Sequence, residues 1–207
     1  MKIAREGYPL IAFTAFMFLG SLFFSPGVAF FLAPLLGLVA WFFRDPERVP
    51  DGEGFLSPAD GRIVEILPAV HPYAGDSVKI GIFMNPLSVH VNRMPADGRV
   101  ESLEYIPGKK WMAFEPKASE LNERMCIGLS TPHGPIFLVQ VAGFLARRIV
   151  CRLSRGQRVE RGERFGMIRL GSRVDIWLPA ETRLAVALGE NLFAGKTVLG
   201  GMPRDDF

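Results

Sequence analysis

The sequence predicts a mostly β protein of the α+β class, in which a compact β domain follows an N-terminal hydrophobic helical hairpin. Three observations support this prediction. No charged residue lies between Gly7 and Phe43. After Arg44 the chain changes to short β-branched runs that are interrupted by Gly and Pro. The 207 residues suffice for one domain with a hydrophobic core and an appendage.

The apolar block has the length of a membrane segment. Ser25-Pro26-Gly27 in its middle is a turn signal, which divides the block into two arms of roughly 17 residues. At 1.5 Å per residue each arm reaches roughly 25 Å, slightly less than the hydrocarbon core of a bilayer. We therefore expect residues 1–43 to anchor the chain in a membrane, as two thin spans or as a re-entrant hairpin. A buried helical pair in a soluble core is the alternative.

The residues that flank the block predict the side of the membrane. Either hairpin geometry returns the chain to the side that it left. Lys2 and Arg5 precede the block, and Arg44 and Arg48 follow it. Basic flanks favour the cytoplasmic side, so we expect the cytoplasmic face of the cell (inner) membrane. The aromatic run at residues 41–43 then falls where an aromatic belt lies.

Residues 44–207 are expected to form one β-rich domain without an internal linker. Turns at Ala59-Asp-Gly61 and Ala96-Asp-Gly98 precede two of the predicted strands. Gly162-Glu163 and Gly189-Glu190 precede short runs near the C-terminus, and these paired turns resemble the flattened barrel of biotinyl and lipoyl carriers. A turn or two of helix is expected over residues 118–125. The clearest strand-length runs are residues 61–67, 78–83, 98–103 and 136–142.

Composition excludes several classes of function. The net charge is only +3 and no basic run occurs, which argues against a nucleic-acid partner and suits a protein near an anionic membrane surface. The two cysteines, Cys126 and Cys151, are too few for a disulfide framework and lack metal-ligand spacing. We expect both to be buried, and we expect no metal site.

The pair Gly171-Ser172 interrupts a strand-like pattern in a chemically suggestive way. Glycine permits backbone conformations that other residues resist, and the next residue carries a hydroxyl. Oγ of Ser172 could then add to the Gly171 carbonyl and convert the amide to an ester. Elimination would split the chain, and hydrolysis of the resulting dehydroalanine would leave a pyruvoyl group. An ordinary β-bulge or turn is the alternative for an isolated Gly-Ser pair.

The stretch around Gly171-Ser172 resembles the processing site of the phosphatidylserine decarboxylases, in particular their short prokaryotic form. Several motifs in the same order extend this resemblance over nearly the whole chain. They are Phe42-Phe-Arg-Asp-Pro-Glu-Arg48, Ser57-Pro-Ala-Asp-Gly61, Met84-Asn-Pro-Leu-Ser-Val-His-Val-Asn-Arg-Met-Pro95, Asn122-Glu-Arg124, Gln140-Val-Ala-Gly-Phe-Leu-Ala-Arg-Arg-Ile-Val150 and Arg161–Pro179.

The resemblance implies a self-processing enzyme that converts phosphatidylserine to phosphatidylethanolamine. Cleavage between Gly171 and Ser172 would give a β chain of residues 1–171 and an α chain of residues 172–207, which stay together as a heterodimer. The cofactor would be a pyruvoyl group derived from Ser172, with neither metal nor pyridoxal phosphate. Its ketone would condense with the serine amine of the lipid and accept the electrons left by CO2. The resemblance leaves open whether the heterodimers form a homo-oligomer.

The resemblance also implies a self-cleavage triad of Asp60, His90 and Ser172. A neutral imidazole can take the Ser172 proton, and a carboxylate fixes its tautomer and stabilises the imidazolium. Longer family members carry two histidines in this segment, whereas this chain has His90 and then Arg93 at the second place. Whether His90 serves cleavage, decarboxylation or both stays open. Candidates for binding the lipid phosphate or carboxylate are Arg93, Lys109, Lys110, Arg147 and Arg148, and a solvated basic face is the alternative for them. Trp111-Met-Ala-Phe114 is a candidate membrane-contacting loop, with a buried loop as the alternative.

Two rival functions share part of the pattern. A pyruvoyl-dependent decarboxylase of a soluble amino acid would use the same self-cleavage, but a soluble substrate gives no reason for a membrane hairpin. A non-enzymatic biotinyl-like membrane-associated module would share the strands, but such carriers need a lysine at the hairpin tip, and residues 170–173 contain none. A serine hydrolase would need Gly two residues after the nucleophile, where this chain has Val174.

Overall fold

The computed structural model describes residues 2–108, 121–143, 148–169 and 172–201. The chain divides into two compact units, Met1–Glu47 and Arg48–Phe207. Each unit is described by itself below. This division lies four residues beyond the end of the predicted hairpin.

The first unit is a pair of apolar helices. A 3-10 turn, η1 (Arg5–Gly7), leads into α1 (Tyr8–Phe24), and α2 (Pro26–Phe42) follows after one residue. Ser25 is extended, with φ −161° and ψ 100°, and Pro26 then takes the first turn of α2, where no backbone N–H is needed. Short strands β1 (Lys2–Ile3) and β2 (Arg44–Asp45) pair antiparallel and bring the ends of the unit together. The predicted pair of 17-residue arms is confirmed.

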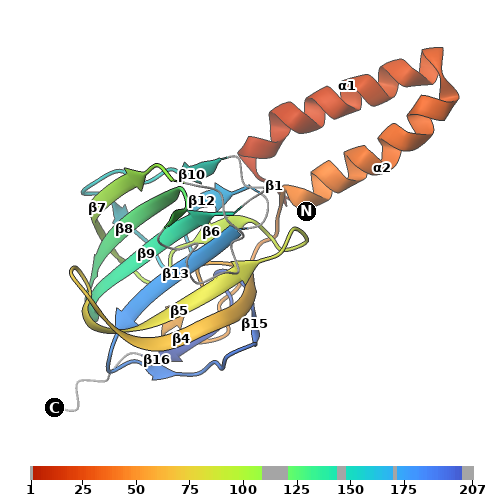
Figure 1. The fold of residues 1–207 in the computed structure, drawn as a ribbon. Helices are drawn as coiled ribbons and strands as arrows, with labels where there is room; N and C mark the ends of the chain where they lie inside the picture. Colours follow the sequence, from red (N-terminus) through yellow and green to blue (C-terminus); the bar gives the residue numbers. More distant parts are fainter. Residues whose placement is uncertain (1, 109–120, 144–147, 170–171, 202–207) are drawn as a thin grey trace. The chain divides into compact units, whose positions relative to one another are not determined.

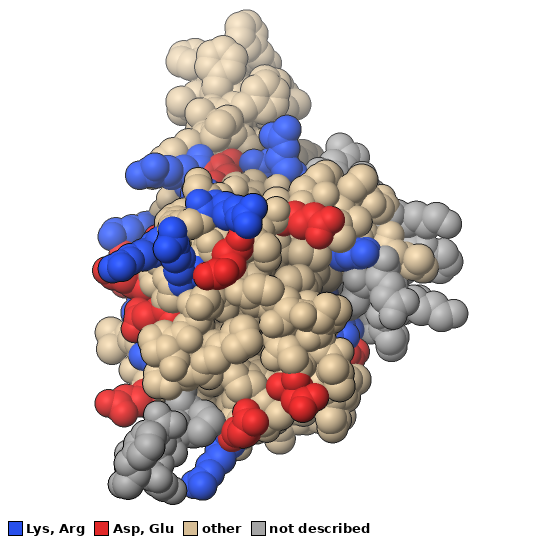
Figure 2. Space-filling view, turned by 90° about the vertical axis from the view of Figure 1, so that its left-hand side faces the viewer, with Lys and Arg blue, Asp and Glu red and all other residues tan. Residues whose placement is uncertain are grey.

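Most side chains of α1 and α2 are apolar and at least partly exposed. In Figure 2 the helices show no Lys, Arg, Asp or Glu, whereas such residues are interspersed over the second unit. The continuous helix over Arg5–Phe24 is apolar and long enough to cross a membrane, and Pro26–Phe42 is shorter. Phe24 is 90% exposed, as befits a helix without a protein core around it. Other large exposed side chains are Phe13, Phe16, Leu19, Phe23, Phe30, Phe31 and Leu38.

The second unit is built on one curled eight-stranded sheet (Figure 1). Its strand order is β11-β7-β8-β9-β13-β5-β4-β15, and every pairing in it is antiparallel. Two three-stranded sheets, β10-β12-β6 and β14-β16-β3, accompany it. The strands are β3 (Phe55–Leu56), β4 (Gly61–His71), β5 (Gly75–Met84), β6 (Val91–Arg93), β7 (Gly98–Ile106), β8 (Arg124–Thr131), β9 (Gly134–Ala142), β10 (Ile149–Cys151), β11 (Arg158–Val159), β12 (Arg164–Ile168), β13 (Ser172–Pro179), β14 (Arg183–Leu184), β15 (Asn191–Leu192) and β16 (Val198–Gly201).

The mostly β fold with an N-terminal helical region confirms the coarse prediction. The four predicted runs became β4, β5, β7 and β9. Gly61 begins β4 where its Cα approaches the Phe83 carbonyl so closely that a Cβ would collide with it. The helix expected over 118–125 is wrong at its end, because β8 begins at Arg124 and pairs with both β7 and β9. The likeness to a biotinyl or lipoyl barrel stays a prediction.

One hydrophobic core joins the three sheets of this unit. On β13, Val174, Ile176 and Leu178 face the core, so by strand alternation Ser172 faces it too. Phe165 of β12 and Phe55 of β3 belong to the same core. Residues 173, 175 and 177 point to the opposite face of the sheet. One face of β13 is therefore apolar except for Ser172, whereas the opposite face carries two charged residues and a tryptophan.

Candidate active site

Ser172 is buried at the start of β13, on the face of the strand that lines the core. As the first residue of β13 it pairs with Met84, the last residue of β5, and with Ala142, the last residue of β9. The serine is fully buried, and its Oγ lies 3.6 Å from Sδ of Met84. A thioether is a weak acceptor, so this contact leaves the hydroxyl largely uncommitted. Gly171, the predicted cleavage partner, lies outside the described residues.

His90 is brought toward Ser172 by the small sheet β10-β12-β6. It is fully buried and immediately precedes β6. Its carbonyl accepts a hydrogen bond from Ile168 N–H, 3.4 Å between N and O, which extends the β6–β12 pairing. Ile168 ends β12 and stands four residues before Ser172. Strand pairing therefore joins the His90 segment to the segment that enters the predicted cleavage site.

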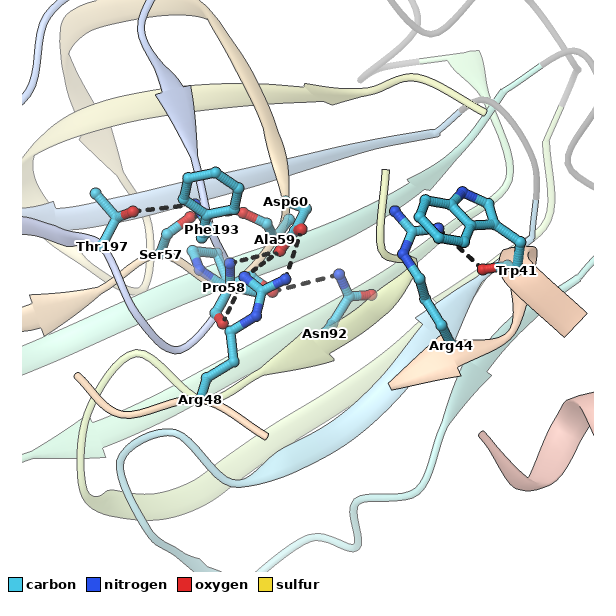
Figure 3. Close-up of polar contacts among 11 residues, drawn as sticks. Trp41, Arg44, Arg48, Ser57, Pro58, Ala59, Asp60, Asn92, Phe193 and Thr197 are labelled. Atoms are coloured by element: carbon cyan, nitrogen blue, oxygen red, sulfur yellow. Dashed lines mark hydrogen bonds and ion pairs between the residues drawn. The ribbon is translucent and has the colours of Figure 1, made fainter. Parts of the chain in front are cut away.

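Asp60 is held by a set of contacts that we call the Asp60 cluster: Arg48, Asp60, Phe193 and Ala194 (Figure 3). Both guanidinium NH groups of Arg48 donate to Asp60, one to each carboxylate oxygen, at 2.8 Å. The backbone N–H of Ala194 donates to Oδ1 at 2.7 Å. Arg48 also donates to the Ala194 carbonyl, at 3.4 Å, and lies over the Phe193 ring, 5.4 Å from its centroid. The carboxylate is therefore fixed on three sides.

The position of Asp60 relative to Ser172 follows from the sheet. Gly61 begins β4, which pairs with β5, and β5 pairs with β13 at Ser172. Two strand spacings correspond to about 10 Å, which is the backbone separation expected between the start of β4 and Ser172. The hydrogen bonds of Asp60 to described residues go to Arg48 and Ala194. Its predicted role toward His90 stays a prediction.

A buried amide pair connects the Asp60 loop to the surroundings of Ser172. Asn92 Nδ2 lies 3.3 Å from the Pro58 carbonyl and 3.9 Å from the same Met84 Sδ that contacts Ser172. Gln140 Nε2 donates to Asn92 Oδ1 at 2.9 Å. Both amides are fully buried, and Gln140 Oε1 has no hydrogen-bond partner among the described residues. The two amides form a polar pair within a largely apolar core, and each contact of this pair links segments that are distant in the sequence.

Asn92 and Gln140 were not singled out as site residues from the sequence. A signal for Gln140 was present, because a polar residue at a core-facing position of an otherwise apolar strand is unusual. Asn92 lies in the motif that contains His90, but its side-chain partners come from distant segments. No local pattern identifies such partners.

The opposite face of β13 carries an ion-pair network that we call the Arg173 cluster: Glu65, Lys79, Arg173 and Asp175. Arg173 is 1% exposed and lies 2.7 Å from Glu65 and 2.5 Å from Asp175. Lys79 lies 2.6 Å from Glu65 and 3.7 Å from Asp175. Gly81 makes room for the guanidinium, since a Cβ there would collide with it.

The titration of the Arg173 cluster reflects this pairing. Burial would raise the pKa of Glu65, but hydrogen bonds from Lys79 and Arg173 outweigh it and lower the pKa below its ordinary value. Burial would likewise lower the pKa of Arg173, but the carboxylates of Asp175 and Glu65 raise it. The pKa shifts of Glu65 and Arg173 therefore both favour the charged forms of this pair, which joins β4 and β13.

The other predicted binding residues are dispersed. Arg93 is buried and donates to the Gly162 carbonyl at 3.3 Å, whereas Arg148 is exposed. His71 accepts hydrogen bonds at Nδ1 from the N–H groups of Tyr73 and Ala74, and burial lowers its pKa. In the described part of the chain no group of three or more His, Cys, Asp or Glu could hold a metal. Lys109, Lys110, Arg147 and the loop at residues 111–114 lie outside the described residues.

The two cysteines are free thiols that are at least partly buried. Cys126 is buried and Cys151 is partly buried, and neither is in a disulfide. Burial raises the pKa of both thiols. A thiol with a raised pKa is mostly protonated near neutral pH and is therefore a poor nucleophile.

Comparison with known proteins identifies the family. The phosphatidylserine decarboxylase family profile matches residues 35–200. A phosphatidylserine decarboxylase proenzyme from Chlorobium luteolum is 51% identical over 170 residues, which cover 81% of this chain and 80% of the relative. Proenzymes of the same name from Chlorobaculum tepidum and Oleidesulfovibrio alaskensis are 46% and 47% identical, over 97% and 96% of this chain and 98% and 93% of their own lengths. This chain belongs to the phosphatidylserine decarboxylase family.

Proposed function

We propose that this chain is a proenzyme that cleaves itself between Gly171 and Ser172 and then decarboxylates phosphatidylserine to phosphatidylethanolamine. Family membership carries the decarboxylation of phosphatidylserine, and the proenzyme names of the relatives support processing into two chains. The observation that supports Ser172 as the processed residue is its complete burial at the start of β13, where its hydroxyl contacts, among the described residues, the weak acceptor Sδ of Met84. The substrate named for these relatives disfavours a soluble amino acid as the alternative substrate.

In the proposed processing reaction, Ser172 supplies the three carbon atoms of the new group, and water supplies its ketone oxygen. Its Oγ forms a bond to the Gly171 carbonyl carbon, the C–N bond breaks, and the proton of the hydroxyl passes through a base to the freed amine. Loss of the Ser172 α-proton and cleavage of its Cβ–Oγ bond leave a carboxylate on Gly171 and dehydroalanine at residue 172. Water then replaces the nitrogen, which leaves as ammonia. We assign the base to His90 and its orientation to Asp60.

The surroundings of Ser172 suit the resulting pyruvoyl group. The group would be formed at residue 172, which is fully buried and pairs with Met84 and Ala142. When formed, the group supplies a carbonyl that binds the substrate amine and an electron sink for decarboxylation. The chain's own contribution is to bury this position, to exclude water and to hold His90 where it can return a proton. The α and β chains would remain together because β13 lies between β5 and β9.

We propose that α1 and α2 hold the enzyme at the cytoplasmic face of the cell membrane. Their exposed apolar side chains need a hydrocarbon environment, and the substrate family is a membrane phospholipid. Arg44 lies over the Trp41 ring, 4.2 Å from its centroid, and donates to the Trp41 carbonyl at 2.9 Å. A tryptophan with an adjacent arginine suits the end of a helix at the membrane interface.

Intact mass spectrometry of the purified protein tests the processing proposal. We expect two chains, residues 1–171 and 172–207, the smaller one lighter by one ammonia than a chain with a serine N-terminus. Ser172→Ala should give one chain without decarboxylase activity, because it lacks both nucleophile and precursor. His90→Ala should slow cleavage by about a hundredfold or more. Ser130→Ala, at an exposed serine, is the matched control. A single 207-residue species that decarboxylates phosphatidylserine at the full rate would exclude the proposal.

A further inference from the structure

Arg48 is the residue that holds the Asp60 carboxylate in the second unit. It is the first residue of that unit, twelve positions before Asp60 in the chain. Its side chain is 10% exposed and that of Asp60 is 9% exposed. Both carboxylate oxygens receive a guanidinium NH, so the pair is bidentate (Figure 3). A bidentate pair fixes the plane of the carboxylate as well as its position.

The energetics make Arg48 difficult to replace. A carboxylate that is nearly removed from water requires a charged partner or several donors, and breaking such a pair leaves an uncompensated buried charge. Without Arg48, the described donor to Asp60 would be the Ala194 N–H alone. The carboxylate would then be free to rotate or to draw water into the loop. A lysine could restore the charge but not the second hydrogen bond.

The cluster is also connected to the strand that follows His90. The loop of residues 57–60 presents the Pro58 carbonyl to the backbone N–H of Arg93, at 3.0 Å, and to the side chain of Asn92. Both donors to the Pro58 carbonyl lie on β6, directly after His90. Ser57 Oγ donates to the Ala59 carbonyl at 2.7 Å and stiffens the same loop. The orientation of Asp60 and the position of the His90 segment are therefore coupled through a short chain of bonds.

We propose that Arg48 is a positioning residue for self-cleavage, which acts by fixing the Asp60 carboxylate. This inference rests on the proposed function, in which Asp60 orients His90. The Asp60 carboxylate accepts three hydrogen bonds from described residues. Ala194, which would be part of the small chain, donates one of them, and Arg48 of the large chain donates the other two. A carboxylate offers about four lone-pair positions, so one on Oδ2 remains for a further donor.

The test measures the rate of chain cleavage during cell-free synthesis of the full-length protein, by pulse and chase. We expect Arg48→Gln to slow cleavage by at least about tenfold, and Arg48→Lys to slow it less, because the charge is kept. Arg44→Gln is the matched control: it removes an arginine of the same motif, one that contacts Trp41, and should change the rate by less than about twofold. Added ethylguanidinium should partly restore cleavage in an Arg48→Ala variant and should not affect Arg44→Gln.

A double-mutant cycle separates positioning from a general loss of structure. If Arg48 acts through Asp60, then Arg48→Gln should cause no further slowing in an Asp60→Asn background. Thermal unfolding of each variant shows which ones are folded, and Arg48→Lys carries the test if Arg48→Gln does not fold. Equal cleavage rates for Arg48→Gln and Arg44→Gln would overturn the inference, and so would independent multiplicative effects of Arg48→Gln and Asp60→Asn. In either case, cleavage of the wild type would leave the proposed function standing. Absence of cleavage in the wild type would overturn both.

Discussion

The Asp60 cluster and the Arg173 cluster each provide charged partners for a nearly buried carboxylate, in two different parts of the fold. The Arg173 cluster lies on three adjacent strands, where register alone brings Glu65, Lys79 and Arg173 together. The Asp60 cluster joins loops, and its bond between Asp60 and Ala194 spans 134 positions of sequence. A network within a sheet reinforces what strand pairing already holds. The network between loops holds together segments that strand pairing does not align, and it fixes the orientation of the Asp60 carboxylate.

Removing the arginine of each cluster should therefore have opposite consequences. Arg173→Met leaves Asp175, which is fully buried, with Lys79 as its remaining partner in the cluster, at 3.7 Å. We expect the free energy of unfolding to fall by about 3–5 kcal/mol, as for other broken buried pairs. Cleavage in the folded fraction should stay within about threefold of wild type, because β5 and β9 still hold Ser172. Chemical denaturation and the pulse-chase assay measure the two quantities.

Lys196→Met provides the control for that measurement. Lys196 lies 3.7 Å from Asp51 and is 46% exposed, so its loss should cost less than about 1 kcal/mol. The comparison of the two clusters fails if Arg173→Met destabilises the protein no more than Lys196→Met does. It also fails if folded Arg173→Met protein loses cleavage as strongly as Arg48→Gln.

Acidification should weaken the Arg173 cluster by a smaller amount. Because the pKa of Glu65 is lowered in the folded protein, its contribution is fully present above the ordinary pKa of 4.5 and is lost as the pH falls through the folded value. We expect the free energy of unfolding to decrease below about pH 4.5, and to decrease less in Glu65→Gln. Urea unfolding across this range measures the effect. Glu181→Gln, at an exposed carboxylate, is the control. Parallel pH profiles of Glu65→Gln and wild type would contradict this prediction.

Removal of residues 1–43 should have the smallest effect on cleavage. The truncated chain keeps Arg48 and the whole second unit, so we expect a cleavage rate within about twofold of wild type. Turnover of phosphatidylserine in vesicles should fall, because the anchor no longer holds the enzyme at the substrate surface. Activity on dispersed short-chain phosphatidylserine should survive. A folded truncation that does not cleave would mean that the helices help to build the site. Combining the truncation with Arg48→Gln should reproduce the slowing seen in the full chain.

Much of the fold was predictable because its signals are local. The turn at Ser25-Pro26-Gly27 predicted two helical arms, and α1 and α2 meet at Ser25. β-branched runs behind Asp-Gly turns predicted β4 and β7, which begin at Gly61 and Gly98. β8 was missed because residues 124–131 contain Gly128 and a polar end, and pairing with two neighbours compensates for this weak local preference.

The sequence by itself determined the helical arms, the main strands and the serine at which a strand is interrupted, since each depends on neighbours within a few residues. Only the tertiary structure decided that Asp60 is held by Arg48, that Asn92 meets Gln140 and that Arg173 is buried among charges. These contacts depend on strand order and on loops that meet across the core. Sequence periodicity reports which face a side chain occupies, but it carries no information about which distant residue occupies the space opposite.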